Sequence, residues 1–154
     1  MISTRLMTID DYNNAYELWI GVPGIGLNNS DDSFEGFRRY IERNPNTSFV
    51  AEDAGRIVGA VLAGHDGRRG FLYHAAVLPQ YRNRSIGRRL IDLVLNALEQ
   101  ERISKVGLLA FRENETGNAF WEKIGFGARD DCTYRDKMIR EIHYNSNPFL
   151  REQK

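Results

Sequence analysis

The sequence predicts one mixed α/β (α+β) domain built on a central sheet of about seven strands. Its 154 residues are 42% hydrophobic and 27% charged, which is typical of a globular chain with a single core. Strand-like runs and helical patterns alternate in the order β-α-α-β-β-β-α-β-α-β-β. No internal repeat and no low-complexity segment interrupts this order, so a repeat architecture is excluded.

The first elements are a strand and two helices. Residues 2–7 form the strand, and Thr8 with the acidic pair Asp10 and Asp11 is a candidate cap for the first helix. The apolar positions of that helix are Tyr12, Ala15, Tyr16, Leu18 and Trp19. Residues 21–29 are rich in Gly and Asn and predict a loop. The second helix has Phe34, Phe37, Tyr40 and Ile41 at helical spacing, and it ends at Pro45 and Asn46.

Three strands follow. Residues 48–52 and 57–63 are β-type runs joined by a hairpin turn at 53–56. Residues 70–77 form the third run, after a second turn at 65–69.

The second half predicts a helix, a strand, a short helix and a hairpin. The helix begins at Ile86, with Leu90, Leu93, Val94, Ala97 and Leu98 along one stripe. A buried strand at 106–111, a helix around 118–123 and a final hairpin from 126 to about 142 follow. We therefore expect one domain over residues 1–144 and a polar, loosely held tail over 145–154.

Composition excludes several classes of function. The 21 basic side chains balance the 21 acidic ones, so a generic nucleic-acid-binding surface is not expected. No stretch reaches the ~20 apolar residues of a membrane span, and no secretory signal is evident, so we expect a cytoplasmic protein that does not bind membranes. The single cysteine, Cys132, has no partner for an internal disulfide, and no Cys/His spacing suggests a metal site.

One loop carries a chemical signal. Residues 77–90 run from a strand end through a proline turn directly into a helix, whose first N–H groups and dipole favour an anion. Arg82, Arg84, Arg88 and Arg89 concentrate positive charge there, and Gly87 lies in the first helical turn. The alternative is an ordinary helix start with solvated arginines and a tolerated glycine.

The order of elements, the Val-Leu-Pro-Gln-Tyr-Arg segment at 77–82, Asn114 and the Phe-Trp-Glu-Lys-Ile-Gly-Phe segment at 120–126 resemble the GNAT superfamily of N-acetyltransferases. Within it, residues 64–70 (Gly-His-Asp-Gly-Arg-Arg-Gly) are similar to bacterial YpeA-like acetyltransferases. The resemblance implies a mostly antiparallel sheet in which strands four and five splay apart. The pantetheine arm of acetyl-CoA would lie in that gap like an added strand.

The resemblance also implies the cofactor site and the partners. The positions that would bind acetyl-CoA are Val77, Arg82, Asn83, Arg84, Ser85, Ile86, Gly87, Arg88, Asn114, Phe120 and Trp121. The acceptor would be a small-molecule or peptide amine, and the protein a monomer or homodimer. Ser85 stands where the family usually has glycine, but serine is a preferred helix N-cap and binding should survive.

The general acid and general base that the resemblance implies are absent from their usual positions. Members of the family often have, at the position of Trp121, a tyrosine that protonates the departing thiolate, and an indole N–H cannot replace it. Some members of the family have a glutamate base on the fifth strand, whereas residues 106–111 contain no carboxylate. We therefore expect acceptor amines of low pKa, because they lose a proton at neutral pH with less help from a base. Candidate catalytic residues are Tyr73, Tyr134 and Glu52, with Asp66 also considered. Tyr73 leads because strand parity places it on the face of Val77, unless a bulge intervenes, and places His74 on the other.

Two functions fit this pattern. The first is an N-acetyltransferase in which the amine attacks acetyl-CoA directly in a ternary complex. The second is a CoA-binding module without turnover, suggested by Trp121 and by the strand that lacks a carboxylate. A nucleotide-binding regulator is disfavoured, because no Gly-x-x-x-x-Gly-Lys-Ser/Thr run is present.

Overall fold

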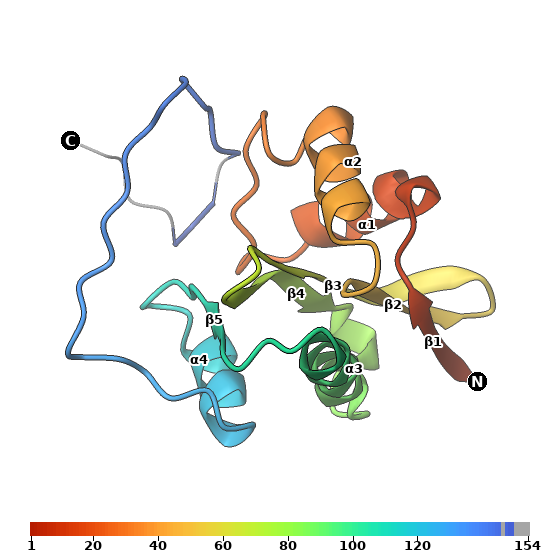
Figure 1. Cartoon of the computed structure of the whole chain (residues 1–154). Coiled ribbons are helices and arrows are strands. Elements are labelled where there is room, and N and C mark those ends of the chain that lie inside the picture. The colour runs from red at the N-terminus through yellow and green to blue at the C-terminus, as the bar shows by residue number, and fades with distance from the viewer. Residues whose placement is uncertain (146, 150–154) are drawn as a thin grey trace.

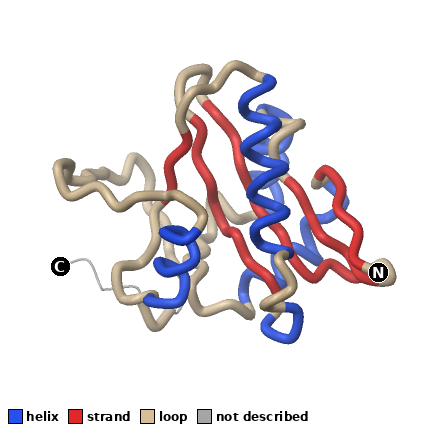
Figure 2. Tube along the Cα trace, turned by 90° about the horizontal axis from the view of Figure 1, so that it is seen from below, coloured by secondary structure: helices blue, strands red, loops and turns tan. Residues whose placement is uncertain are grey.

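The computed structural model describes residues 1–145 and 147–149 and has a five-stranded sheet at its centre, in the order β1-β2-β3-β4-β5. The strands are β1 (Ile2–Leu6), β2 (Phe49–Asp53), β3 (Arg56–His65), β4 (Gly70–Val77) and β5 (Val106–Leu108). Neighbouring strands are antiparallel except β4 and β5, which are parallel. Figure 2 shows the strands side by side, with one long helix lying across them.

Helices cover both faces of the sheet. The 3₁₀ turn η1 (Ile9–Asp11) leads into α1 (Tyr12–Ile20), which is followed by α2 (Phe34–Arg43). A second 3₁₀ turn, η2 (Pro79–Tyr81), precedes α3 (Ile86–Gln100), and α4 (Glu115–Lys123) follows β5. Figure 1 shows α1 and α2 over one face, with α3 and α4 over the other.

Each face has its own core. Trp19 and Phe37 are buried between the sheet and the pair α1 and α2. Leu90, Val94 and Leu98 of α3 are buried against the opposite face. The sheet therefore separates two apolar layers. A β4 side chain packs in one layer or the other according to the face of the sheet on which it lies.

Local sequence signals set several element boundaries. Thr8 and Asp11 form a reciprocal capping box around η1. The Ser33 hydroxyl accepts the Gly36 N–H at 3.1 Å and starts α2. Ala54 (φ 49°) and Gly55 (φ 81°) are both left-handed in the β2–β3 turn, as a two-residue hairpin turn requires.

The prediction of about seven strands was wrong, because the final hairpin does not form. Residues 127–141 contain no regular element, and all of their side chains are exposed. Charged residues dominate this segment, and some pair locally, as Arg129 does with Asp131 at 2.7 Å. An added strand needs an apolar residue at every second position, and this segment supplies too few.

β5 is also shorter than predicted, ending at Leu108 rather than at 111. Leu109 is exposed, and Phe111 stacks instead on Phe149 at a centroid distance of 5.9 Å. α4 begins earlier than predicted, because the Asn114 side chain caps it by accepting the Gly117 N–H at 3.1 Å.

The described part of the C-terminal tail is attached to the loop before α2. Asn145 N–H donates to the Leu27 carbonyl at 2.9 Å, and the Asn147 amide donates to the carbonyls of Pro23 and Ile25. This differs from the loosely held tail that its polar composition predicts. Residues 146 and 150–154, which the same prediction included, lie outside the described residues.

No helix in the described part of the chain combines the length and the apolar character that a membrane crossing requires.

Candidate functional site

A β-bulge in β4 controls the geometry of the site. Ala76 pairs with Ala60 and Tyr73 pairs with Leu62, so two residues of β4 lie opposite one residue of β3. His74, in the bulge, has a left-handed backbone with φ 53°. The extra residue shifts by one the alternation of side chains between the two faces of the sheet, so the alternation before the bulge does not continue to Val77.

The bulge places Tyr73 and Val77 on opposite faces, contrary to the parity argument. Val77 packs in the layer of α3, whereas the Tyr73 ring meets Tyr40 of α2 edge to face at 5.9 Å. His74 shares the face of Tyr73, since its ring lies 5.1 Å from that of Trp19 in α1.

Tyr73 is partly open to solvent, with 43% of its surface exposed. Burial of the rest of the side chain raises the pKa of its hydroxyl, and the nearby hydroxyl of Tyr134 and carboxylate of Asp31 raise it further. The phenol is therefore protonated at neutral pH, so it can donate a proton but is poorly suited to accept one.

The other two candidate catalytic residues lie in different places. Tyr134, in the loop after α4, is 63% exposed and is close enough to Tyr73 to affect its pKa. Glu52 lies on β2, separated from β4 by β3, and pairs with Arg5 at 2.6 Å. The structure thus brings Tyr134 towards Tyr73 but does not bring Glu52 there.

The pairing between β4 and β5 is short. It covers Gly70–Leu72 and Val106–Leu108, and no residue beyond Leu72 pairs with β5. The Leu78 N–H donates to the Val58 carbonyl at 2.8 Å and so points towards β3. Successive amides of a strand point to opposite sides, so the Val77 N–H points away from β3, to the side on which β5 has diverged.

The loop between β4 and α3 leaves a series of backbone donors free. Asn83 (φ 62°) and Ser85 (φ 60°) are left-handed, and the Ser85 hydroxyl makes no capping bond although it occupies the N-cap. From Asn83 to Arg88, no backbone N–H has an acceptor in the described part of the protein. Free N–H groups at a helix start attract an anion, and their number favours phosphate.

The charges of this loop are also unneutralised. Arg82, Arg84 and Arg88 form no ion pair with any described residue. Arg84 lies over the Tyr81 ring at 5.0 Å, and the Tyr81 hydroxyl donates to Asp53 at 2.7 Å, which fastens the loop to the β2–β3 turn. The loop is therefore anchored at its start and positively charged where its amides are free.

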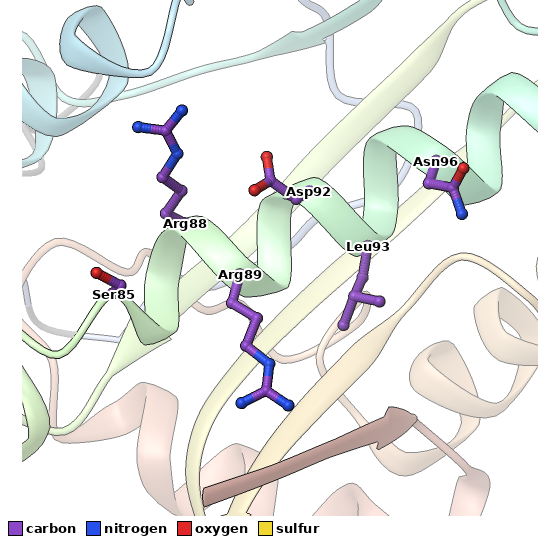
Figure 3. A pocket seen from close by; sticks show the side chains of 6 residues that line it. All are labelled: Ser85, Arg88, Arg89, Asp92, Leu93 and Asn96. Atoms are coloured by element: carbon purple, nitrogen blue, oxygen red, sulfur yellow. The ribbon is translucent and has the colours of Figure 1, made fainter.

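A surface hollow of about 410 Å³ lies along α3 next to this loop. Its lining consists of Ser85, Arg88, Arg89, Asp92, Leu93 and Asn96. Figure 3 shows the side chains of Arg88 and Arg89 leaving the helix in opposite directions. Arg89 donates to the Ile2 carbonyl of β1 at 3.4 Å, whereas Arg88 has no partner among the described residues.

Gly87 lies where three distant segments meet. A Cβ placed on it would be 3.3 Å from Phe120 of α4 and 3.8 Å from Val77 of β4. Phe120 and Ile86 belong to the core layer of α3, and Trp121 packs there edge to face with Phe126 at 5.3 Å. The fold thus brings the predicted cofactor positions of β4, the loop and α4 to one end of the gap between β4 and β5.

The sequence analysis did not predict one pair of interacting residues. His74 Nε2 lies 2.6 Å from Asp32 Oδ1, and both side chains are nearly buried. Strand parity placed His74 on the face opposite Tyr73, and Asp32 was not considered. A local sequence pattern predicts neither the bulge nor a contact between two residues that are 42 positions apart.

The sequence model of the acetyltransferase (GNAT) family matches residues 10–126. The chain belongs to this family. It is accordingly an acyltransferase, and its acetyl donor is acetyl-CoA. The matched range includes the splayed strands, the arginine loop and α4.

Individual proteins agree with the family assignment. An acetyltransferase of Pectobacterium atrosepticum is 29% identical over 140 residues, which cover 91% of this chain and 98% of that protein. The PaiA N-acetyltransferase of Thermoplasma acidophilum, solved with coenzyme A, superposes with a TM-score of 0.70 at 18% identity, covering 84% of this chain and 92% of that one. The ribosomal-protein-alanine N-acetyltransferase of Brucella melitensis superposes with a TM-score of 0.65 at 20% identity, covering 90% and 100%. At these identities the structures show that the fold is shared.

Proposed function

We propose that this acetyltransferase moves the acetyl group of acetyl-CoA to a primary amine by direct attack in a ternary complex. The observation that carries the proposal is the early end of the β4–β5 pairing, which leaves the edge of β4 open next to the free amides of residues 83–88. One elongated ligand with a diphosphate at one end and a polar arm at the other fits both features.

The diphosphate would lie at the start of α3. The free N–H groups from Asn83 to Arg88 and the guanidinium groups of Arg82, Arg84 and Arg88 supply donors and charge there. The contact between Gly87 and Phe120 leaves little room for a side chain at this point. Phe120 and Trp121 would then border the arm on the side of α4, and Asn114 would hold the start of that helix.

The thioester would lie along the open edge of β4. The Val77 N–H points into that space and is suited to hydrogen-bond the carbonyl oxygen as negative charge develops on it. Holding donor and acceptor together lowers the barrier further, because the reaction no longer depends on a chance encounter.

The acceptor would enter from the face of α1 and α2, because the phosphate end would be anchored on the side of α3, across the sheet from α1 and α2 (Figure 1). The loop before α2 and the segment after α4 border this side, where Tyr73 and Tyr134 also lie. We assign residues 1–144 to this single functional domain, within the YpeA-like branch of the family.

The test is an assay of free thiol with acetyl-CoA and a panel of primary amines, namely peptide α-amines, lysine side chains, polyamines and amino sugars. We expect release that depends on the amine, with a product heavier by one acetyl group in mass spectrometry. Tight binding of acetyl-CoA without release for any amine would instead support a CoA-binding module.

A further inference from the structure

The side chains of His74 and Asp32 form a nearly buried pair on the face of α1 and α2. His74 Nε2 and Asp32 Oδ1 are 2.6 Å apart, and the two side chains are 13% and 7% exposed. The Trp19 ring lies 5.1 Å from the imidazole and limits its rotation. The pair joins the bulge of β4 to the loop before α2.

The loop holds Asp32 in a fixed position. Its Oδ2 accepts the Asn28 N–H at 2.8 Å, and its backbone carbonyl accepts the Tyr12 hydroxyl at 2.7 Å. No lysine or arginine pairs with this carboxylate in the described part of the chain, so His74 is its only basic partner there.

The second ring nitrogen of His74 remains available. Nδ1 has no hydrogen-bond partner in the described part of the chain. It is also not fully buried, since Trp19 Nε1 is the only buried side-chain nitrogen or oxygen there that lacks a partner. A carboxylate that accepts from Nε2–H leaves Nδ1 as the nitrogen that can take up a proton.

The bulge places His74 beside the gap in the sheet. β4 loses its β5 partner after Leu72, and His74 follows two residues later on the face opposite α3. The proposed phosphate site is on the side of α3, so an amine approaching the thioester from the other face meets His74.

We propose that His74 is the general base that takes the proton from the acceptor amine, and that Asp32 is the positioning residue that orients its ring. This rests on the proposed function. As the amine nitrogen forms its bond to the acetyl carbon, the thioester C–S bond breaks and its electron pair leaves on sulfur. The proton of the amine moves to His74 Nδ1, and the thiolate takes a proton from the Tyr73 hydroxyl, which regains one from solvent, so the products are an amide and the free thiol.

Other titratable groups surround this pair. The Tyr12 hydroxyl of α1 donates to the Asp32 carbonyl, the Tyr73 ring of β4 lies 6.2 Å from the His74 ring, and Tyr40 of α2 packs on Tyr73. Asp31 is adjacent in the loop, and Tyr144 of the C-terminal segment is affected by Asp31 and Asp32. Tyr12, Tyr40, Tyr73 and Tyr144 all have raised pKa values, so these hydroxyls stay protonated at neutral pH.

The variant His74→Gln distinguishes a role of His74 as a base from a role as a structural hydrogen-bond donor. The glutamine amide can still donate to Asp32 but cannot accept a proton. We expect kcat/KM at neutral pH to fall about 100-fold or more, with no change in the affinity for acetyl-CoA. The pH profile of kcat/KM should also differ between the two proteins, because only the native enzyme carries a base at this position. The variant should show only the rise that belongs to the acceptor amine.

His74→Gly provides a second test, because the left-handed backbone at this position suits glycine. Added imidazoles should restore turnover, and the rate should follow the basicity of the imidazole used. Asp32→Asn should lower kcat/KM by about 10-fold or more while leaving acetyl-CoA affinity intact. His65→Gln, at the end of β3, is the matched control and should behave as the native enzyme.

A folded His74→Gln variant with native kcat/KM and a native pH profile would overturn this inference and leave the proposed function standing. Loss of thermal stability without any change in the pH profile would equally overturn it, since the pair would then only fasten the loop. Absence of acetyl transfer by the native protein to every amine would overturn both proposals.

Discussion

Leu72 and Leu108 are the last residues paired between β4 and β5. Beyond them β4 continues to Val77 along an open edge, and the chain then enters the loop whose amides from Asn83 to Arg88 have no acceptor among the described residues. The open strand edge and the proposed phosphate site therefore follow one another along one proposed ligand path. The following predictions test that path and the packing that supports it.

Substitution of Gly87 by glutamate should remove acetyl-CoA binding. It places a carboxylate at the proposed phosphate site and a Cβ 3.3 Å from Phe120. We expect the dissociation constant, measured by calorimetry, to rise about 100-fold or more, since charge-assisted hydrogen bonds contribute about 1.5–3 kcal/mol each. Gly127→Glu makes the same change in charge in open space and should bind normally. Native affinity in a folded Gly87→Glu variant would remove the loop from the site.

Removal of the Arg88 guanidinium should weaken binding moderately. Arg88 has no protein partner in the described residues, so its substitution by alanine should leave stability unchanged. We expect the dissociation constant to rise about 5- to 10-fold, because one exposed charged contact is lost. The salt dependence of binding should also become weaker. Arg39→Ala, on the exposed side of α2, should change neither quantity, and equal effects of both variants would point to net charge instead.

Tyr73→Phe should lower turnover without changing the affinity for acetyl-CoA. The raised pKa keeps the Tyr73 hydroxyl protonated, so it is suited to donate a proton to the departing thiolate. We expect kcat to fall about 10-fold or more in the thiol assay. Tyr134→Phe, at the more exposed neighbouring tyrosine, should have a smaller effect. Equal turnover of Tyr73→Phe and the native enzyme would reduce Tyr73 to a packing residue.

Arg5 should stabilise the fold at neutral pH through Asp11. Burial raises the pKa of Asp11, but the hydrogen bonds from Arg5 and from the Thr8 N–H outweigh it, and the net pKa is lowered. A carboxylate whose pKa is lowered by folding stabilises the fold at pH values above its pKa in the unfolded chain, which is about 3.9. This stabilisation is lost as the pH falls through its pKa in the folded chain. Arg5→Met should therefore lower the free energy of unfolding by about 2 kcal/mol at neutral pH.

Urea unfolding at several pH values checks this account. The difference between Arg5→Met and the native protein should narrow as the pH falls below about 4, where the Asp11 carboxylate of the unfolded chain is protonated. A difference that stays constant across the acid range would mean that Arg5 acts through the packing of its alkyl chain.

The sequence predicted elements whose signals are local. Thr8 was predicted as the cap of the first helix, and it forms a capping box with Asp11, three residues away. β4 was predicted with its observed bounds, because its apolar run is flanked by turn residues. In these cases the residues that decide the structure are neighbours in the chain.

The features that were missed depend on distant partners. Nothing in residues 70–77 signals a bulge at His74, and the face of Tyr73 was predicted wrongly for that reason. The bulge is joined to Asp32, 42 residues away, by a bond that no local pattern shows. The final hairpin was overpredicted because a few apolar residues, such as Met138 and Ile139, resemble a strand although their neighbours are charged and exposed.

The most direct test of the ligand path compares two thioesters by calorimetry. S-acetyl-pantetheine has the same reactive arm as acetyl-CoA but lacks the diphosphate and the nucleotide. We predict that the native protein binds acetyl-CoA at least about 100-fold more tightly, because the free amides and arginines at the start of α3 hold the phosphates. Equal affinity for the two compounds would contradict the account, since the loop would then contribute nothing to binding.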